Sequence, residues 1–544
     1  MKTDGLSKGN WRIRLGALIL VVGVVVYIPW MLTHLNPQAL WLAIPFAVAN
    51  ILLAANALST AINNWQRAVP PERFVPAGQE PVVLTLVPTY GEPDWMVRRT
   101  AESVLRQDWP LDKLRLIISD DAHSAAILDV AVRLATEYPA ARILYHRPPR
   151  HGTPERPGDA KAGNLNSALA LGYAAFPEVT VVETRDADDE VGDRQFLRRV
   201  VAELLSDAPI AFVQTIKDAR VSRGDPFGNR EINFYHGLML GKHAANAVFP
   251  CGSGLVWRGA ALDAIGRFPI WNLVEDLQSG VEALSRGWRG SYVPIVGAVA
   301  QHAPEDIPNV YKQRGTWAID TLRLLFWRGL RGLNWRQRLH FIEMGLFYLY
   351  GFSALLNLLS QAITLIFRIY PLEYAQDTYG VRFWVYALSI EAFLFLLCGR
   401  LPYRALWRMR QVWLGLAPVY VRAAIVALLS GPHRKPVYRV TRKANRFRWY
   451  WRETAIQLVL FVLLVAALLY HLATTPSLAA FEFGLTGWTV FHLVVLSGIV
   501  RGSWFGVGWR RAVTGATVER RLAVEPTPAV AVVAEQRAPT EGLD

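Results

Sequence analysis

The stretch Val181–Glu190, "VVETRDADDE", decides how the chain folds and where its polar site lies. It begins as a short apolar run and then places five carboxylates within eight residues, namely Glu183, Asp186, Asp188, Asp189 and Glu190. The chain as a whole is basic, with a formal net charge of +14. Carboxylates packed this closely repel one another unless a cation or a neighbouring base neutralises them. A solvated turn after a strand would explain a lone D-x-D. The surrounding segments are therefore needed to distinguish such a turn from a ligand-binding site.

These surrounding segments predict an α/β domain with a mainly parallel sheet. "PVVLTLVPTYGEP" reads as a buried strand over 82–87 that breaks at Pro88, and a helix is expected over 94–106. "LRLIISDDA" and "ARILYH" read as further strands, "DAKAGNLNSALALGYAAF" as a basic loop, and "VTVVETRDADDE" as the next strand. Strands that alternate with helices and end in polar residues are typical of parallel sheets. Ligands bind beyond the carboxyl ends of such strands.

Three strand ends carry polar side chains that would converge, at Thr89, Asp120 and Asp186. Carboxylates at i and i+2 beyond a strand can hold one hard divalent cation, and Mg²⁺ takes its other ligands from water and phosphate. A metal diphosphate is therefore the expected ligand, with Lys161 as its countercharge. A phosphatase of the D-x-D-x-T type is the competing interpretation, but "DADDEV" lacks the Gly-Thr-type turn that it would need.

Apolar runs on both sides of this domain are long enough to span a bilayer, which takes about 20 residues each. The first begins at Ile13 and does not read as a cleavable signal. It is too long, and a second run follows without a small-residue cleavage site. The second run covers about 39–61, and a long stretch without a span follows over 66–335. The four later runs cover about 341–366, 383–399, 454–472 and 484–500. The two cysteines give no disulfide framework and favour a reducing compartment.

The distribution of Lys and Arg orients the six predicted spans. Basic residues precede the first span and crowd the segment between the fourth and fifth, whereas the loops between spans one and two and between spans five and six have none. This pattern places both termini and the middle domain in the cytoplasm. The apolar stretch 411–431 would put the basic cluster after it outside if it spanned, so we expect it to lie in the interface as a helix.

Eight short motifs in order resemble those of the processive membrane glycosyltransferases of the cellulose synthase type. They are "VPTYGEP", "ISDDA", "DAKAGNLNSAL", "TRDADD", "CGSG", "VEDLQSG", "QRGTW" and "YRVTRK", and the resemblance covers roughly 10–505. It implies a GT-A-type α/β domain inserted between transmembrane helices. The implied segments are two spans in 1–66, the domain in 80–335, two spans in 336–400, an interfacial helix and gating loop in 401–452, two spans in 453–505 and a disordered tail in 506–544. That tail leaves no room for a cyclic-di-GMP-binding barrel.

The resemblance also implies roles for individual residues. The donor is a UDP-sugar, the metal is Mg²⁺ or alternatively Mn²⁺ held by Asp186 and Asp188, and Asp276 is the general base. The residues matched to the donor nucleotide are Thr89, Glu92, Asp120, Lys161, Asp186 and Asp188. Those matched to the acceptor are Cys251, Gly252, Glu275, Gln313 and Trp317, the last as a stacking platform for the terminal sugar. The gating loop matches at Tyr438, Val440, Thr441 and Lys443.

The chain departs from the family pattern at three motif positions. Thr316 stands where the family has an arginine that helps to hold the diphosphate, and a threonine supplies neither charge nor a bidentate fork. Either a base elsewhere, such as Arg442 or Lys443, takes over, or the donor binds more weakly. Val274 replaces the threonine of the T-E-D motif, and Asp189 stands where cellulose synthases usually have histidine.

The leading functional prediction is a processive, inverting synthase that extends a β-linked polysaccharide from a UDP-sugar and passes it through its own spans. A cellulose-like β-1,4-glucan is placed first, with a 1,3-β-glucan or an N-acetylglucosamine polymer as alternatives. A transferase of one sugar to a polyprenyl phosphate and a non-catalytic degenerate synthase are the other candidates. The predicted partners are the donor, the growing polysaccharide, the lipid bilayer and an envelope export subunit, with no nucleic acid. The predicted location is a bacterial-type inner membrane.

Overall fold

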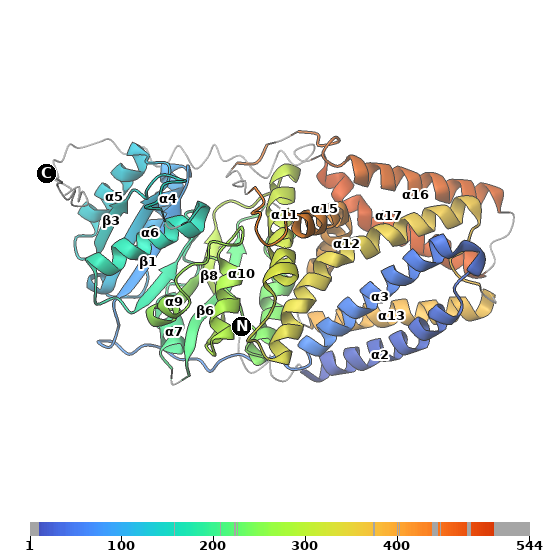
Figure 1. The fold of residues 1–544 in the computed structure, drawn as a ribbon, viewed down its shortest axis with the longest axis horizontal. Helices are drawn as coiled ribbons and strands as arrows, with labels where there is room; N and C mark the ends of the chain where they lie inside the picture. The colour runs from blue at the N-terminus through green and yellow to red at the C-terminus, as the bar shows by residue number, and fades with distance from the viewer. Residues whose placement is uncertain are drawn as a thin grey trace.

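The computed structural model describes residues 10–504 except 157, 207, 222–224, 226, 374–375, 400, 402, 438–443, 447 and 476–479. Figure 1 shows an elongated molecule with an α/β domain at one end and a bundle of long helices at the other. The predicted gating-loop residues Tyr438, Val440, Thr441 and Lys443 and the tail over 506–544 lie outside the described residues. So do Arg442 and the first nine residues of the chain.

The α/β domain is built on one eight-stranded sheet in the order β3-β2-β1-β4-β7-β6-β8-β5. Pairs β1·β2, β1·β4, β2·β3 and β6·β8 are parallel, whereas β4·β7, β6·β7 and β5·β8 are antiparallel. The sheet is therefore mixed, with its parallel half at β1–β4. The strands are β1 (Val83–Thr89), β2 (Leu114–Asp120), β3 (Arg142–His146), β4 (Val181–Thr184), β5 (Asp189–Glu190), β6 (Ile210–Ala219), β7 (Leu255–Arg258) and β8 (Arg289–Ala300).

The first strand is apolar on both faces because helices cover both. All seven residues of β1 are buried. Leu84 and Leu86 pack toward α6, whereas Val87 packs with α4 and α5, as the alternation of side chains along a strand requires. The helices of the domain are α4 (Asp94–Leu105), α5 (Ala125–Glu137), α6 (Ala160–Ala175), α7 (Phe196–Leu204), α8 (Met239–Ala244), α9 (Gly259–Ala264), α10 (Asp276–Ser285) and α11 (Ile307–Arg323).

The predicted basic loop "DAKAGNLNSALALGYAAF" is wrong, because most of it forms helix α6. The Asn164 side chain donates to the carbonyl of Ser119 on β2 (3.0 Å), and the Asn166 side chain donates to the carbonyl of Phe268 (2.8 Å). A side chain at Gly163 would collide with the carbonyl of Gly158. Glycine and asparagine are poor helix formers, so tertiary contacts hold this first turn and fix where Lys161 sits.

Six stretches of helix in the described part of the chain are long and apolar enough to cross a membrane. They belong to α2 (Asn10–Thr33), α3 (Leu40–Asn63), α12 (Trp335–Phe367), α13 (Gln376–Cys398), α16 (Ala455–Thr474) and α17 (Ala480–Gly502). Two of these precede the sheet in sequence and four follow it, in agreement with the six predicted runs. Their side chains form shared apolar cores, as between α2, α3 and α13 around Tyr27, Phe46 and Tyr386.

The predicted interfacial helix at 411–431 is not one straight element. The chain forms α14 (Tyr403–Gly415) and α15 (Ala417–Ser430), which meet at an angle of 57°. Pro418 lies in the first turn of α15, where it lacks the N–H that would continue α14. Helix α11 packs against α15 and α12, so it stands between the sheet and the bundle (Figure 1). The sheet domain and the bundle are thus joined through α11.

Candidate active site

One cavity of about 1660 Å³ extends from the strand ends of the sheet into the helix bundle. Its lining brings together residues that are more than 400 positions apart in the chain, from Leu53 to Arg501. Eleven of the predicted site residues line it: Thr89, Glu92, Lys161, Asp186, Asp188, Cys251, Gly252, Glu275, Asp276, Gln313 and Trp317. The cavity is thus the place where the predicted donor and acceptor residues meet.

Basic side chains form ion pairs with Glu183, Asp186, Asp189 and Glu190 of the acidic stretch. Glu183 forms an ion pair with the fully buried Arg185 (2.5 Å), and Thr85 donates to its other oxygen (2.9 Å). Glu190 pairs with Arg99 (2.5 Å) and with Arg220. The two outer acids are therefore structural, and the three aspartates between them face the cavity.

Asp186 lies between two lysines. Lys161 Nζ is 2.6 Å from Oδ1 and Lys217 Nζ is 2.6 Å from Oδ2, while Lys217 is also 2.9 Å from the buried Asp189. Burial alone would raise the pKa of Asp186, but the charges of Lys161 and Lys217 outweigh it and hold that pKa well below its usual range. Asp186 is therefore a carboxylate at any physiological pH.

Sequence reasoning missed Lys217, although the signal was present. "IAFVQTIKDA" forms strand β6, and Lys217 lies near its end as Asp186 lies beyond the end of β4. Burial by itself lowers the pKa of Lys217, but Asp186 and Asp189 raise it above the ordinary value. Burial also opposes the rise at Lys161, where Asp186 and Glu275 raise the pKa. Both lysines therefore stay charged, Lys161 as predicted and Lys217 in addition.

The predicted base Asp276 is the first residue of α10 and is partly exposed to the cavity. Its Oδ1 accepts the backbone N–H of Leu277 (2.7 Å). Burial, followed by the charge of Glu275, raises the pKa of Asp276 to about 7 against the opposing charge of Lys161. Glu275 Oε1 in turn lies 3.1 Å from Lys161 Nζ. A carboxyl group with a pKa near 7 can accept a proton in neutral solution.

The "CGSG" loop brings its backbone against these charges. The carbonyl of Gly252 accepts from Lys161 Nζ (3.1 Å), and the N–H of Asp186 donates to the Ser253 hydroxyl (3.1 Å). Gly252 has a φ of +80°, and a Cβ there would lie 3.1 Å from Lys161 Nζ and 3.4 Å from Asp276 Oδ2. The positive φ therefore favours glycine here, and a side chain would press against the end of Lys161.

Asp120 is the predicted donor residue that does not line the cavity. Its carboxylate is fully buried and accepts the N–H groups of Ala122 (2.9 Å) and Ser124 (2.6 Å) and the hydroxyl of Tyr145 (3.1 Å). The next residue, Asp121, lines the cavity instead and pairs with the buried Arg156 at 2.7 and 3.0 Å. Asp120 thus shapes the turn after β2. Sequence spacing alone could not distinguish two adjacent aspartates.

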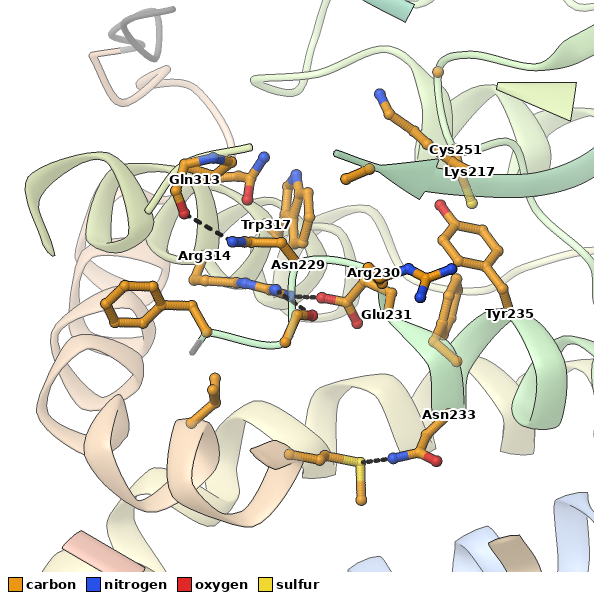
Figure 2. Close-up of a pocket in the computed structure, with 18 of the residues that line it drawn as sticks. Lys217, Asn229, Arg230, Glu231, Asn233, Tyr235, Cys251, Gln313, Arg314 and Trp317 are labelled. Atoms are coloured by element: carbon orange, nitrogen blue, oxygen red, sulfur yellow. Dashed lines mark hydrogen bonds and ion pairs between the residues drawn. The ribbon is translucent and has the colours of Figure 1, made fainter. Parts of the chain in front are cut away.

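Helix α11 supplies the far wall of the cavity. Figure 2 shows Gln313, Arg314 and Trp317 on this helix, across from Lys217 and Cys251 on the sheet side. The Arg314 guanidinium lies 4.8 Å from the ring centre of Trp317 and is paired with Glu231, a residue at a φ of +47°. Trp317 is 37% exposed, so its ring is available to a ligand.

Thr316 does not replace the charge of an arginine. It lines the cavity, and its hydroxyl donates to the carbonyl of Lys312 within the helix (2.8 Å). Lys435 also lines the cavity and donates to the carbonyl of Ile270 (2.9 Å). Lys435 belongs to none of the sequence motifs, and it places a basic side chain at the cavity.

The carboxylates of the cavity suit a divalent cation by their chemistry. Asp186, Asp188 and Asp189 offer hard oxygen donors, which Mg²⁺ and Mn²⁺ prefer. The described residues contain no ready-made group of three or more acidic, histidine or cysteine side chains arranged around a metal. Asp188 and Asp186 both line the cavity, and Asp186 has a lysine at each of its oxygens.

Comparison with known proteins gives the relatives of this chain. Residues 81–319 match the family described as "Glycosyltransferase like family 2". "Putative cellulose synthase 2" of Komagataeibacter xylinus is 30% identical over 477 residues, which cover 81% of this chain and 29% of that protein. "Cellulose synthase catalytic subunit [UDP-forming]" of Pseudomonas fluorescens (strain SBW25) is 27% identical over 377 residues, which cover 65% of this chain and 48% of that protein.

The chain thus spans less than half of the length of each of these relatives. A solved mannosyltransferase from Pyrobaculum calidifontis, in complex with GDP-Man and Mn²⁺, is 19% identical with a TM-score of 0.48, over 71% of this chain and 99% of that one. The family match and the mixed sheet identify the fold as GT-A-like, flanked by apolar helices. The predicted fold class and the resemblance to cellulose synthase catalytic subunits are confirmed.

Proposed function

We propose, on the premise that residues 81–319 form a family 2 glycosyltransferase domain, that the chain is a UDP-sugar-dependent synthase of a β-linked polysaccharide. The two curated relatives carry the names of cellulose synthases, one of them marked as UDP-forming. We place a cellulose-like β-1,4-glucan first among the products. The reaction inverts the anomeric centre, and the enzyme keeps its product between additions.

One observation carries this proposal above the others. A carboxyl group with a raised pKa, Asp276, and an accessible aromatic ring, Trp317, line the same cavity as the aspartates and lysines beyond the strand ends. The charged end suits a nucleotide diphosphate, and the ring suits the apolar face of a sugar. Donor and acceptor would therefore meet at Asp276.

The residues then divide the reaction among them. Asp276 takes the proton of the acceptor hydroxyl while that oxygen forms a bond to the anomeric carbon of the donor sugar. The bond between that carbon and the diphosphate oxygen breaks, and UDP leaves with the electron pair. Lys161 and Lys217 keep Asp186 ionised, and Gly252 leaves room beside the base. Trp317 orients the acceptor, which contributes by placing the hydroxyl within reach.

The resident cation would be Mg²⁺, with Mn²⁺ as the alternative, held by Asp188 and Asp186. When bound, it supplies positive charge that offsets the diphosphate of the donor and of the UDP product. The donor nucleotide would lie against Thr89, Glu92 and Asp121, which line the sheet end of the cavity. Asp121 takes the place that the sequence prediction gave to Asp120.

The same cavity continues among the helices, and the growing chain would enter the bundle there. Its lining there includes side chains of α3, α12, α13, α14 and α15, with the aromatic residues Phe347, Tyr348, Trp407, Trp413 and Tyr420. Aromatic rings bind a polymer without a strong hold, so the polymer can slide. We propose that the six apolar helices span the inner membrane of a bacterium and that the sheet domain lies in the cytoplasm. An envelope subunit would receive the polymer.

The test uses the purified full chain in nanodiscs with Mg²⁺ and a panel of radiolabelled UDP-sugars. Products are sized on gels and digested with linkage-specific glycanases, with Asp276→Asn as the control. We expect a long polymer from UDP-glucose that a β-1,4-glucanase degrades and that the variant does not make.

Other outcomes would redirect the proposal. A polymer resistant to that enzyme, or one made from UDP-N-acetylglucosamine, would change the product but keep the synthase. Transfer of a single sugar to a polyprenyl phosphate would overturn processive synthesis. Absence of turnover with every donor, after lipids are added back, would make the chain a degenerate synthase.

A further inference from the structure

The loop that leads into the proposed base has no regular structure of its own. Residues 271–275 connect β7 and α9 to the start of α10 at Asp276. Asn272 and Leu273 are nevertheless buried. The direction in which Asp276 points therefore depends on what holds this loop from outside.

Asp320 of α11 holds two consecutive backbone amides of the loop. Its side chain is 1% exposed, and Oδ1 accepts from the N–H groups of Leu273 (2.8 Å) and Val274 (3.4 Å). The Asn272 side chain completes the connection by donating to the backbone carbonyl of Asp320 (3.0 Å). Burial, followed by the charge of Asp276, raises the pKa of Asp320. The neutral form of this carboxyl group would hold the same amides.

Arg323, one turn further along α11, holds the start of the loop. It donates to the carbonyl of Trp271 (2.9 Å), and its guanidinium lies 4.2 Å from the centre of the Trp271 ring. The same guanidinium donates to the carbonyl of Arg434 (3.2 Å), and the Trp271 indole donates to the carbonyl of Pro432 (2.8 Å). Segment 432–435 is thereby tied to the same loop.

We propose that Asp320 and Arg323 are positioning residues that clamp loop 271–274 to α11 and so aim Asp276 at the acceptor. This inference rests on the proposed function, in which Asp276 is the base. The clamp begins on the same helix as Trp317, with Asp320 three residues after it. The acceptor platform and the base are therefore held by one rigid element, although Asp276 and Trp317 are 41 positions apart in the sequence.

The first experiment compares Asp320→Asn with Asp320→Ala. Asparagine keeps an oxygen for the two amides and removes only the charge, whereas alanine removes the clamp. We expect Asp320→Ala to lower kcat by roughly 100-fold, since small displacements of a catalytic group have effects of that order. Asp320→Asn should stay within about threefold of the wild type, because its amide oxygen still accepts both N–H groups. UDP affinity, measured by calorimetry with Mg²⁺, should be unchanged in both.

A second readout does not need turnover. Amide hydrogen exchange of the peptide that covers 271–276 should accelerate in Asp320→Ala and not in Asp320→Asn. The matched control is Glu80→Ala, because Glu80 is also a buried carboxylate that accepts a backbone N–H, from Gly78 (2.7 Å), but lies outside the cavity. This control should leave kcat and exchange at 271–276 unchanged.

Each outcome bears on the clamp. Unaltered kcat and exchange in Asp320→Ala would overturn it, as would an equal loss in both variants, which would give the charge of Asp320 the leading role. If Asp320→Ala does not fold, Arg323→Gln against Arg323→Lys carries the test, with lysine expected to restore part of kcat. A wild-type protein without turnover would defeat the proposed function, while exchange would still decide on the clamp.

Discussion

The two ends of the cavity differ in the residues that line them, with charged side chains at the sheet end and aromatic side chains at the helix end. At the sheet end, the half-buried Asp186, Lys161 and Lys217 and the buried Asp189 form a network of ion pairs with distances of 2.6 to 2.9 Å. At the helix end, aromatic side chains line the wall, and Trp317 keeps an exposed ring. The sheet end holds charge at fixed points, whereas in the proposed function the helix end lets a neutral polymer pass. Asp276 lies where they meet.

This difference predicts that substitutions at the two ends separate two activities. Substitutions at the sheet end should alter donor binding and the rate of sugar transfer. Substitutions at the helix end should alter the binding of the acceptor and the length of the product. Asp276 should affect chemistry and leave both binding events intact. The four tests that follow run from the largest expected effect to the smallest.

Replacing the base should have the largest effect. We expect Asp276→Asn to lower polymer synthesis by about 10²–10⁴-fold, the usual contribution of a general base. UDP affinity in Mg²⁺ should stay within about twofold of the wild type, because the asparagine occupies the same space. Calorimetry and radiolabel incorporation measure the two quantities. Asp263→Asn on the exposed side of α9 is the control, and a loss of UDP binding in Asp276→Asn would contradict the division between the two ends.

Removing a predicted metal ligand should come next. Asp188→Asn should lower activity by roughly 100-fold at a Mg²⁺ concentration that saturates the wild type, equivalent to about 2.7 kcal/mol. Raising the Mg²⁺ concentration should restore part of the activity, because the variant binds the cation more weakly. Asp129→Asn, which changes an exposed partner of Arg133, should behave as the wild type. Equal activity of Asp188→Asn at every Mg²⁺ concentration would move the cation elsewhere.

The helix end should respond differently to Trp317→Ala. Loss of one aromatic stacking partner should raise the acceptor KM about tenfold and shorten the product, since such contacts contribute up to about 1.5 kcal/mol. Trp317→Phe should recover most of the length, and Trp95→Ala, at an exposed tryptophan outside the cavity, is the control. Product length is read on gels, and UDP affinity should not change. A loss of UDP binding would place Trp317 at the donor.

The smallest effect concerns pH. The pKa of Asp276 is raised to about 7, so the proposed base is protonated and inactive below that pH, and activity should rise with pH and level off above it. Between pH 6.5 and pH 8 we expect kcat to increase about fourfold. Glu275 on the same element raises the pKa of Asp276, Lys161 of α6 opposes this, and Asp186 raises it further. Glu275→Gln should therefore shift the rise to lower pH, and an unshifted profile would separate Glu275 from the titration.

The same contrast explains what the sequence could predict. The sheet end was readable because its acids directly follow apolar strands, so that one rule located Thr89, Asp186 and the neighbouring carboxylates. Lys217 obeys the same rule and was missed because it belongs to no motif. Asp120 and Asp121 are adjacent, and only the structure shows that the first accepts hydrogen bonds from its own turn and that the second lines the cavity.

The helix end was not readable in this way. Its wall is assembled from segments near 228–235, 313–321 and 403–413, which share no periodicity and lie far apart in the chain. The clamp at Asp320 involves backbone amides, which leave no mark in a sequence. The helix α6 was misread as a loop because Gly163, Asn164 and Asn166 weaken its helical pattern, and their long-range contacts could not be foreseen.

The first turn of α6 has a consequence for how such chains are recognised. Asn164 and Asn166 anchor the helix to its neighbours, whereas Lys161 alone carries charge into the cavity. A variant that lacks Lys161 would still have the two asparagines that hold the helix in place. In "KAGNLN", Gly163, Asn164 and Asn166 thus hold the fold together. To separate active from inactive sequences of this kind, the residue at position 161 should be compared separately from its neighbours in the motif.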